Sequence, residues 1–112
     1  MTRQRLPSRR PSLGIQVDHP GHFSAVSYAV SIGFHQGFVR EVFISCNKLT
    51  TAMHTSGLEV ATLISIALQH GASLEELAGA MPREEDGTAQ GAAGAVLDAV
   101  IQEISQMKEA VA

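Results

Sequence analysis

Five histidines and a single cysteine are the residues of this chain that most directly suggest metal-binding or nucleophilic chemistry. No histidine pair has the four-residue spacing, with a glutamate, of a helical zinc site, and Cys46 has no second cysteine for a Cys-x-x-Cys motif. His19 and His22 flank a predicted turn and could share a metal with a third ligand, although a plain surface turn is the interpretation that we favour. Cys46 ends a predicted strand on its inward side, so we expect a buried thiol without a base to activate it. We therefore predict no catalytic residue, no metal site and no cofactor, zinc included.

Phosphate binding is the other chemistry that the residue types suggest, at two places. The arm over residues 1–11 carries clustered arginines between prolines, which favours an extended chain, and guanidinium groups suit phosphate. Residues 87–94 are rich in glycine and open a predicted helix, where backbone N–H groups can hold an anion, although the Lys-Ser/Thr ending of a phosphate-binding loop is missing. The candidate ligand-binding residues are Arg5, Arg9, Arg10, Gly87, Thr88, Gln90 and Gly91. The simpler alternatives are a solvated tail for the arm and an ordinary loop-to-helix junction for the glycines.

The distribution of charge argues against a body that binds nucleic acid. The formal net charge is −3, with eight Lys and Arg residues against eleven Asp and Glu residues. Arg3, Arg5, Arg9 and Arg10 lie in the arm and every acidic residue follows it, so the body is acidic and would oppose DNA. Nucleic-acid binding through the arm is therefore the third-ranked function.

The length of 112 residues is enough for one domain with a single core and too small for a barrel enzyme with a separate substrate domain. We assign residues 1–11 to the arm and residues 12–112 to that domain. No apolar run approaches the roughly 20 residues that cross a bilayer, and the basic N-terminus lacks the apolar segment of a secretory signal. With one cysteine in the chain, these features predict a cytoplasmic protein without membrane contact.

Alternating apolar and polar residues predict three strands. They cover residues 12–17, 22–34 and 38–46, with turns at residues 18–21 and 35–37. The core side of the second strand should carry Val26, Tyr28, Val30, Ile32 and Phe34. Strands joined by such short connections pair antiparallel, so the expected sheet is a three-stranded meander.

A buried helix should follow over residues 56–70. Ser56 and Glu59 fit a capping box at its start, and Gly71 supplies a left-handed stop. His70 precedes this stop, where a ring near a helix C-terminus has a structural role. Residues 47–55 would then be a connection.

Two more helices complete the predicted fold. Ser73 and Glu76 form a second capping box for a short helix from residue 74 to about residue 81, which Pro82 ends. After an exposed loop over residues 83–90, the last helix runs from residue 91 and carries an apolar stripe of Ala93, Val96, Leu97, Val100, Ile101, Ile104 and Met107. The predicted class is α+β in the order β-β-β-α-α-α, with the three helices packed on one face of the sheet.

Four short motifs occur in the order and spacing of one known module. They are Arg3-Gln4-Arg5-Leu6-Pro7-Ser8-Arg9-Arg10, Glu41-Val42-Phe43-Ile44, Leu68-Gln69-His70-Gly71-Ala72-Ser73-Leu74-Glu75-Glu76-Leu77, and Gln90-Gly91 followed by Ala95-Val96-Leu97-Asp98. Over residues 3 to 105 the chain resembles the TSCPD domain, found toward the C-terminal end of adenosylcobalamin-dependent ribonucleotide reductases and also as small separate proteins. Some members of that family carry cysteines associated with zinc binding. This chain lacks such residues, so the zinc role does not carry over.

The resemblance implies a function connected with ribonucleotide reductase. This chain cannot be a complete reductase itself. Such an enzyme needs a large barrel, a radical-forming cysteine and a reducing cysteine pair, whereas this chain has one cysteine. We expect a non-catalytic accessory or interaction domain connected with deoxyribonucleotide synthesis, with a ribonucleotide reductase or another protein as its partner. The alternative is a small domain that binds a phosphate-bearing ligand such as a nucleotide.

A homodimer joined through sheets is a further expectation. A three-stranded sheet has two edges, and so small a domain can leave one sheet face incompletely covered. Phe23 in the second strand and Phe43 in the third would then share an exposed apolar patch with Val39.

Overall fold

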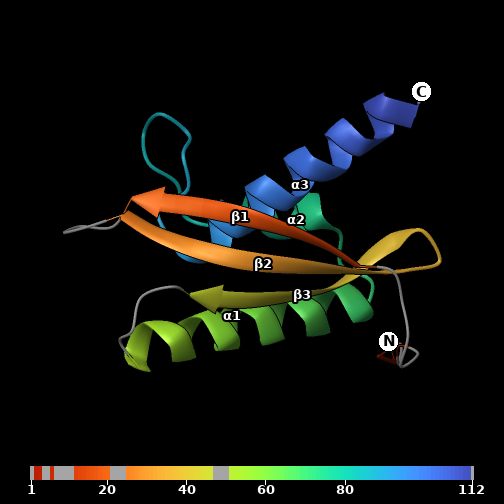
Figure 1. The fold of residues 1–112 in the computed structure, drawn as a ribbon, viewed down its shortest axis with the longest axis horizontal. Helices are drawn as coiled ribbons and strands as arrows, with labels where there is room; N and C mark the ends of the chain where they lie inside the picture. Colours follow the sequence, from red (N-terminus) through yellow and green to blue (C-terminus); the bar gives the residue numbers. More distant parts are fainter. Residues whose placement is uncertain (1, 4–5, 7–11, 21–24, 47–50, 112) are drawn as a thin grey trace. The chain divides into compact units, whose positions relative to one another are not determined.

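The computed structural model describes residues 2–3, 6, 12–20, 25–46 and 51–111 of the chain. Three strands precede three helices (Figure 1): β1 (Ser12–Pro20), β2 (Ala25–His35), β3 (Phe38–Cys46), α1 (Thr51–Gln69), α2 (Leu74–Ala80) and α3 (Ala92–Val111). This order confirms the predicted α+β class. The chain divides into two compact units, Met1–Ala72 and Ser73–Ala112. The single domain over residues 12–112, and the packing of all three helices on one face, stay predictions.

The first unit contains an antiparallel sheet with the strand order β1-β2-β3. β1 continues past Val17 through the predicted turn, because Asp18, His19 and Pro20 stay in register with β2. Pro20 ends this edge strand, a position at which a proline costs no ladder hydrogen bond. At the other end of β2, Gln36 and Gly37 have φ of 54° and 82°, the positive pair that a tight two-residue hairpin requires. The predicted meander and its second turn are confirmed.

A β-bulge in the second hairpin changes which side chains face the core. Gly33 pairs with Glu41 and Phe34 pairs with Val39, so Arg40 is an extra residue in β3. The extra residue moves Val39 to the side of Ile32, where it is buried. The prediction that Val39 belongs to an exposed patch is therefore wrong, because sequence alternation assumes a strand without a bulge. Elsewhere the pattern holds, and the buried set of this sheet includes Tyr28, Val30, Ile32, Val42 and Ile44.

Helix α1 begins at Thr51, so the predicted start at Ser56 is wrong. Ser56 lies inside the helix, and its spacing to Glu59 is an i, i+3 pair on a helix face instead of a capping box. Gly57 lies in the second turn of the helix, where a β-carbon at that position would lie 3.4 Å from Ile44 Cγ2. The predicted end is confirmed: Gly71 has φ of 104°, and Ala72 N–H donates to Ala67 O at 3.0 Å in a Schellman arrangement.

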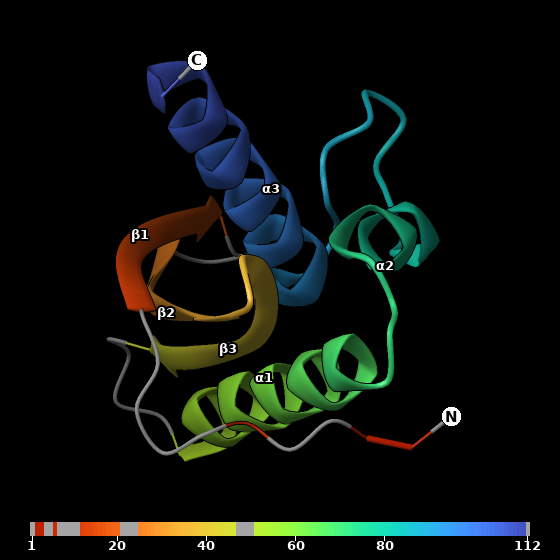
Figure 2. The same cartoon turned by 90° about the vertical axis from the view of Figure 1, so that its right-hand side faces the viewer.

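Helix α1 lies along the free edge of β3, as Figures 1 and 2 both show. The Ser65 hydroxyl accepts from Val42 N–H at 2.9 Å and donates to Val42 O at 3.0 Å. One turn later, Gln69 Nε2 donates to Arg40 O at 3.1 Å. Gly57 and Ala61 precede Ser65 at four-residue steps and are small enough for close approach. The helix thus satisfies backbone groups that an uncovered edge strand would present to other chains.

The second unit consists of α2, a hairpin-like loop and α3. Ser73 caps α2 with the predicted box, because Glu76 N–H donates to Ser73 Oγ at 3.0 Å and Ser73 N–H donates to Glu76 Oε1 at 3.3 Å. The loop closes with a bridge between Arg83 and Ala89. Val96, Leu97 and Val100 are fully buried, which confirms the apolar stripe of α3 near its start, whereas Met107 is exposed. Among the described residues, no helix is both long and apolar enough to cross a membrane.

Candidate functional site

One hollow among the described residues of the first unit is a groove between β3 and α1. Its volume is about 360 Å³. It is lined by Arg3, Glu41, Val42, Phe43, Ile44, Leu58, Ala61, Thr62, Ser65, Ile66 and Gln69. We call this feature the β3–α1 groove. The strand and the helix that form it are held together by the Ser65 and Gln69 bonds, so its shape is set by backbone positions.

Two large apolar side chains on the lining of the β3–α1 groove remain exposed to solvent. Phe43 of β3 is 56% exposed, and Leu58 of α1 is 49% exposed. Alternation along β3 explains Phe43, because its neighbours Val42 and Ile44 are buried on the core side. Exposed apolar groups beside a hollow are typical of a contact surface, since burying them against a partner removes apolar area from water.

The polar side chains that line the groove make contacts within the fold. Gln69 is buried and bonds to Arg40 O with its Nε2, while Arg3 Nε donates to its Oε1. Glu41 is also buried, and its side chain occupies the space above Gly33, which has no β-carbon to prevent this. Thr62 Oγ1 donates to Leu58 O within the helix at 2.8 Å. With these groups engaged, the groove is suited to holding an apolar side chain and not to moving protons.

The side chain of Arg40, a residue of β3, contacts the C-terminal end of α1. Its Nη1 donates to Leu68 O at 3.2 Å, so the cation meets a carbonyl in the last turn of the helix, where positive charge is favourable. The guanidinium also lies 5.1 Å from the ring centre of Phe38, within cation–π range. Its Nε is buried without a hydrogen-bond partner among the described residues. The extra residue of the bulge is thus anchored to the helix that covers its strand.

The predicted phosphate-binding residues of the second unit lie in the loop before α3, and most of their donors point inward. Gly87 N–H donates to Glu84 O at 3.0 Å and Gln90 N–H donates to Pro82 O at 3.1 Å. Thr88 donates to Asp86 Oδ1 through both its N–H, at 3.0 Å, and its hydroxyl, at 2.7 Å. These bonds lower the pKa of Asp86 below 3.8, which keeps a negative charge in this loop.

The remaining candidate ligand residues are not brought together with this loop. Gly91 lies just before α3, and its carbonyl accepts from Ala95 N–H at 3.1 Å. Arg5, Arg9 and Arg10 lie outside the described residues. Phosphate binding by these seven residues stays a prediction.

Arg83 is a structural centre that the sequence analysis missed. Its Nη1 and Nη2 bind the carboxylate of Asp98 at 2.7 and 2.8 Å, and the same nitrogens donate to Gly87 O and Ala78 O. One side chain therefore joins α2, the loop and α3. The ion pair lowers the pKa of Asp98 below 3.8, chiefly through the hydrogen bond from Arg83. No period in the sequence links positions 83 and 98, although Arg83 is an isolated cation within an acidic stretch.

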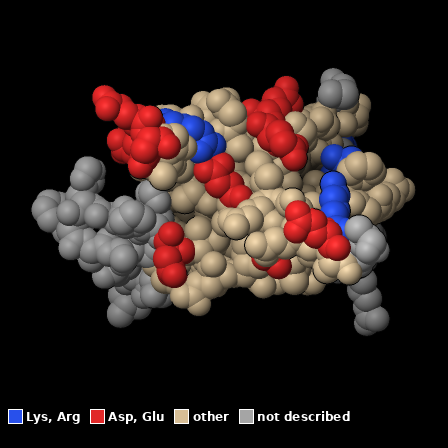
Figure 3. All heavy atoms as spheres, turned by 90° about the horizontal axis from the view of Figure 1, so that it is seen from above, with Lys and Arg blue, Asp and Glu red and all other residues tan. Residues whose placement is uncertain are grey.

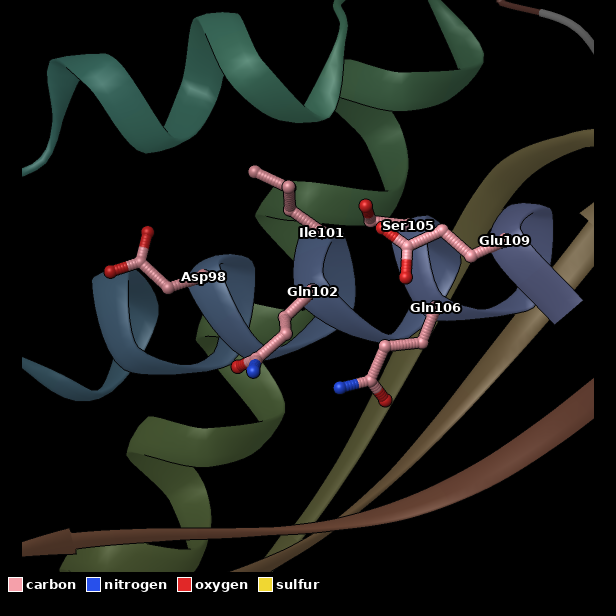
Figure 4. A pocket seen from close by; sticks show the side chains of 6 residues that line it. All are labelled: Asp98, Ile101, Gln102, Ser105, Gln106 and Glu109. Atoms are coloured by element: carbon pink, nitrogen blue, oxygen red, sulfur yellow. The ribbon is translucent and has the colours of Figure 1, made fainter.

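A second hollow, of about 450 Å³, lies on α3 itself. It is lined by Asp98, Ile101, Gln102, Ser105, Gln106 and Glu109. Figure 4 shows that these side chains all come from α3 and spread along it instead of converging on one point. Figure 3 shows several separate groups of acidic side chains on the visible face and basic ones in fewer places, in keeping with the acidic body. We assign no site to this hollow.

The histidine and cysteine candidates are only partly described. His19 lies in β1 opposite Val26, and Cys46 ends β3 opposite Tyr28, but their side chains and all of His22 lie outside the described parts of the chain. Phe23 of the predicted apolar patch also lies outside them. Within the described residues, no three His, Cys, Asp or Glu side chains form a group that could hold a metal ion.

Comparison with known proteins places the chain by its sequence. Neither the curated proteins nor the solved structures include a match to it. The model of one protein family, described as the TSCPD domain, matches residues 3–108. This match spans both compact units and every described strand and helix almost to the end of α3. The chain therefore belongs to the TSCPD domain family.

Proposed function

We propose that this protein is a non-catalytic interaction domain of deoxyribonucleotide synthesis, and that it binds a ribonucleotide reductase through the β3–α1 groove in the cytoplasm. The observation that carries the proposal is the exposure of Phe43 and Leu58 on the lining of one hollow. Membership of the TSCPD domain family supports the choice of partner, because that family is associated with ribonucleotide reductases. The polar groups of the groove are engaged in holding β3 to α1, which favours binding over catalysis.

Phe43 and Leu58 can contribute part of the binding free energy of a specific complex. Full burial of a large apolar side chain contributes about 1.5–3 kcal/mol. Phe43 and Leu58 each have about half of their surface still to bury. Interfaces concentrate their energy in a few such side chains, with surrounding contacts that exclude water. An apolar side chain of the reductase would fit between the aromatic ring and the leucine.

The experiment measures binding of the purified protein to the purified ribonucleotide reductase of the same organism by isothermal titration calorimetry. Phe43→Ser and Leu58→Ser should each weaken binding by about tenfold, because a loss of roughly 1.4 kcal/mol corresponds to that factor. The chain offers matched controls in Phe38→Ser and Leu63→Ser. These replace a phenylalanine of β3 and a leucine of α1 that are 62% and 68% exposed but do not line the groove.

The proposal would be refuted by two results. One is an absence of binding by the unmodified protein at tens of micromolar reductase. The other is an equal loss of affinity in the groove variants and in the controls, which would indicate a general loss of surface hydrophobicity. Circular dichroism of each variant separates either result from unfolding.

A further inference from the structure

The two edges of the sheet are treated differently by the rest of the first unit. The outer edge of β3 is covered by α1, whose Ser65 and Gln69 bond to the backbone of Val42 and Arg40. β1 is the opposite edge, and no strand in the described part of the chain pairs with its outer side. A sheet extension by another chain is therefore possible along β1 and obstructed along β3.

β1 lacks the devices that commonly protect an edge strand. Its nine residues pair with β2 in continuous register from Ser12 to Pro20, without a bulge. It carries no Lys or Arg, Asp18 is its one acidic residue, and its proline stands at the very end. Edge strands that avoid pairing are usually short, bulged or charged in the middle. β1 has none of these properties over residues 12–17.

The sequence of β1 is symmetric in polarity about Ile15. Leu13 and Val17 flank it on the apolar side, and Gly14 and Gln16 flank it on the exposed side. In an antiparallel pair, residues directly opposite each other point to the same face of the sheet. A second β1 placed by a two-fold axis at Ile15 therefore sets Leu13 opposite Val17 and Gly14 opposite Gln16.

From these observations we propose that β1 pairs with β1 of a second copy of this chain, forming a homodimer with a continuous six-stranded sheet. The self-pairing keeps the apolar residues of both copies on one face and sets no like charges directly opposite each other, because Asp18 faces Ser12 of the other copy. The half-exposed Leu13 and Ile15 then extend the apolar face across the junction. This surface is separate from the β3–α1 groove. A result that rejects the dimer therefore does not reject the proposed function, and the reverse also holds.

Light scattering combined with size-exclusion chromatography tests the dimer from 1 to 100 µM, concentrations of the order at which weak homodimers form. The double variant Gly14→Lys with Gln16→Lys sets introduced lysines directly opposite each other at two places and should shift the protein to monomer. Gly14 accepts a side chain in one copy, because a β-carbon there meets nothing within 4 Å. Gly14→Glu with Gln16→Lys is the matched control, which makes the same two pairs attractive and should retain the dimer.

Cross-linking tests the register. In a Cys46→Ser background, Ile15→Cys places two thiols at the two-fold axis and should form a disulfide-linked dimer on oxidation. Asp18→Cys places them roughly 20 Å apart at about 3.4 Å per residue, too far for a disulfide, and should not. A monomer at 100 µM, a dimer that survives the double-lysine change, or equal cross-linking by both cysteine variants would overturn the proposal. Because the cross-link is read in chains without introduced lysines, the proposal stays testable if the double-lysine variant fails to fold.

Discussion

Removal of the Ser65 hydroxyl tests whether α1 stabilises the edge of β3 through hydrogen bonds. That hydroxyl is bonded to both the N–H and the carbonyl of Val42, a residue that is 1% exposed. Ser65→Ala leaves the N–H and the carbonyl of the buried Val42 without this partner. An unsatisfied buried polar group costs about 1–3 kcal/mol, while alanine returns roughly 0.5 kcal/mol through its higher helix propensity. We expect a net loss of about 2 kcal/mol in the free energy of unfolding.

Urea denaturation followed by circular dichroism measures this loss, and amide hydrogen exchange locates it. A destabilisation of about 2 kcal/mol lowers the melting temperature by roughly 8 °C in a protein of this size. The Val42 amide should exchange faster than amides elsewhere in the sheet. Thr62→Ala is the matched control, because the Thr62 hydroxyl bonds to a carbonyl of its own helix and is exposed. A loss below about 0.5 kcal/mol with unchanged protection of the Val42 amide would refute the reasoning.

Three further predictions concern the loop pairing, the bulge and the ligand hypothesis. The pKa of Asp98 is lowered by Arg83, so the stability that this pair contributes is present at neutral pH and is lost as the pH falls through a value below 3.8. Asp98→Asn should therefore melt lower than the unmodified protein at pH 7, and the two melting curves should converge toward pH 2; a constant difference would contradict this. Gly33→Ala places a β-carbon 2.5 Å from Glu41 Oε1 and should cost about 1–3 kcal/mol in urea denaturation, whereas Gly14→Ala meets nothing and should be nearly neutral. If the phosphate-ligand hypothesis is right, millimolar nucleotide should raise the melting temperature in a thermal-shift screen, and a flat response to every nucleotide would reject it.

Local signals predicted the parts of the fold that depend on neighbouring residues. The capping box at Ser73, the helix end at Gly71 and the turn at Gln36–Gly37 could all be predicted from the sequence. Each depends on a few adjacent side chains and on their φ preferences. The order of strands and helices followed from periodicity for the same reason.

Features that depend on distant residues could not be predicted in this way. The bulge at Arg40 moves Val39 into the core, and no local pattern marks it. The start of α1 was misplaced because Ser56 and Glu59 have the sequence of a capping box, whereas the helix begins five residues earlier, at Thr51. The groove itself depends on hydrogen bonds across 23 or more positions, such as Ser65 to Val42. Small and polar side chains recur at four-residue intervals along α1, and this spacing can be seen in the sequence. Their role in packing the helix against β3 can be recognised only when the position of that strand is known.

The two proposed surfaces make one joint prediction, because they lie at opposite edges of the same sheet. A dimer joined along β1 leaves a β3–α1 groove at each end of a six-stranded sheet, with the two β3 strands about 24 Å apart at roughly 4.8 Å per strand. Two linked grooves can hold a densely coated reductase surface more tightly than one groove, without any new contact. The monomeric variant Gly14→Lys with Gln16→Lys should keep the affinity of a single groove in calorimetry, yet dissociate faster than the unmodified protein from a dense reductase surface in interferometry. On a sparse surface the two proteins should dissociate at the same rate. If the variant instead loses affinity in calorimetry, the groove and the β1 edge are not independent, and one of the two surfaces is wrongly placed.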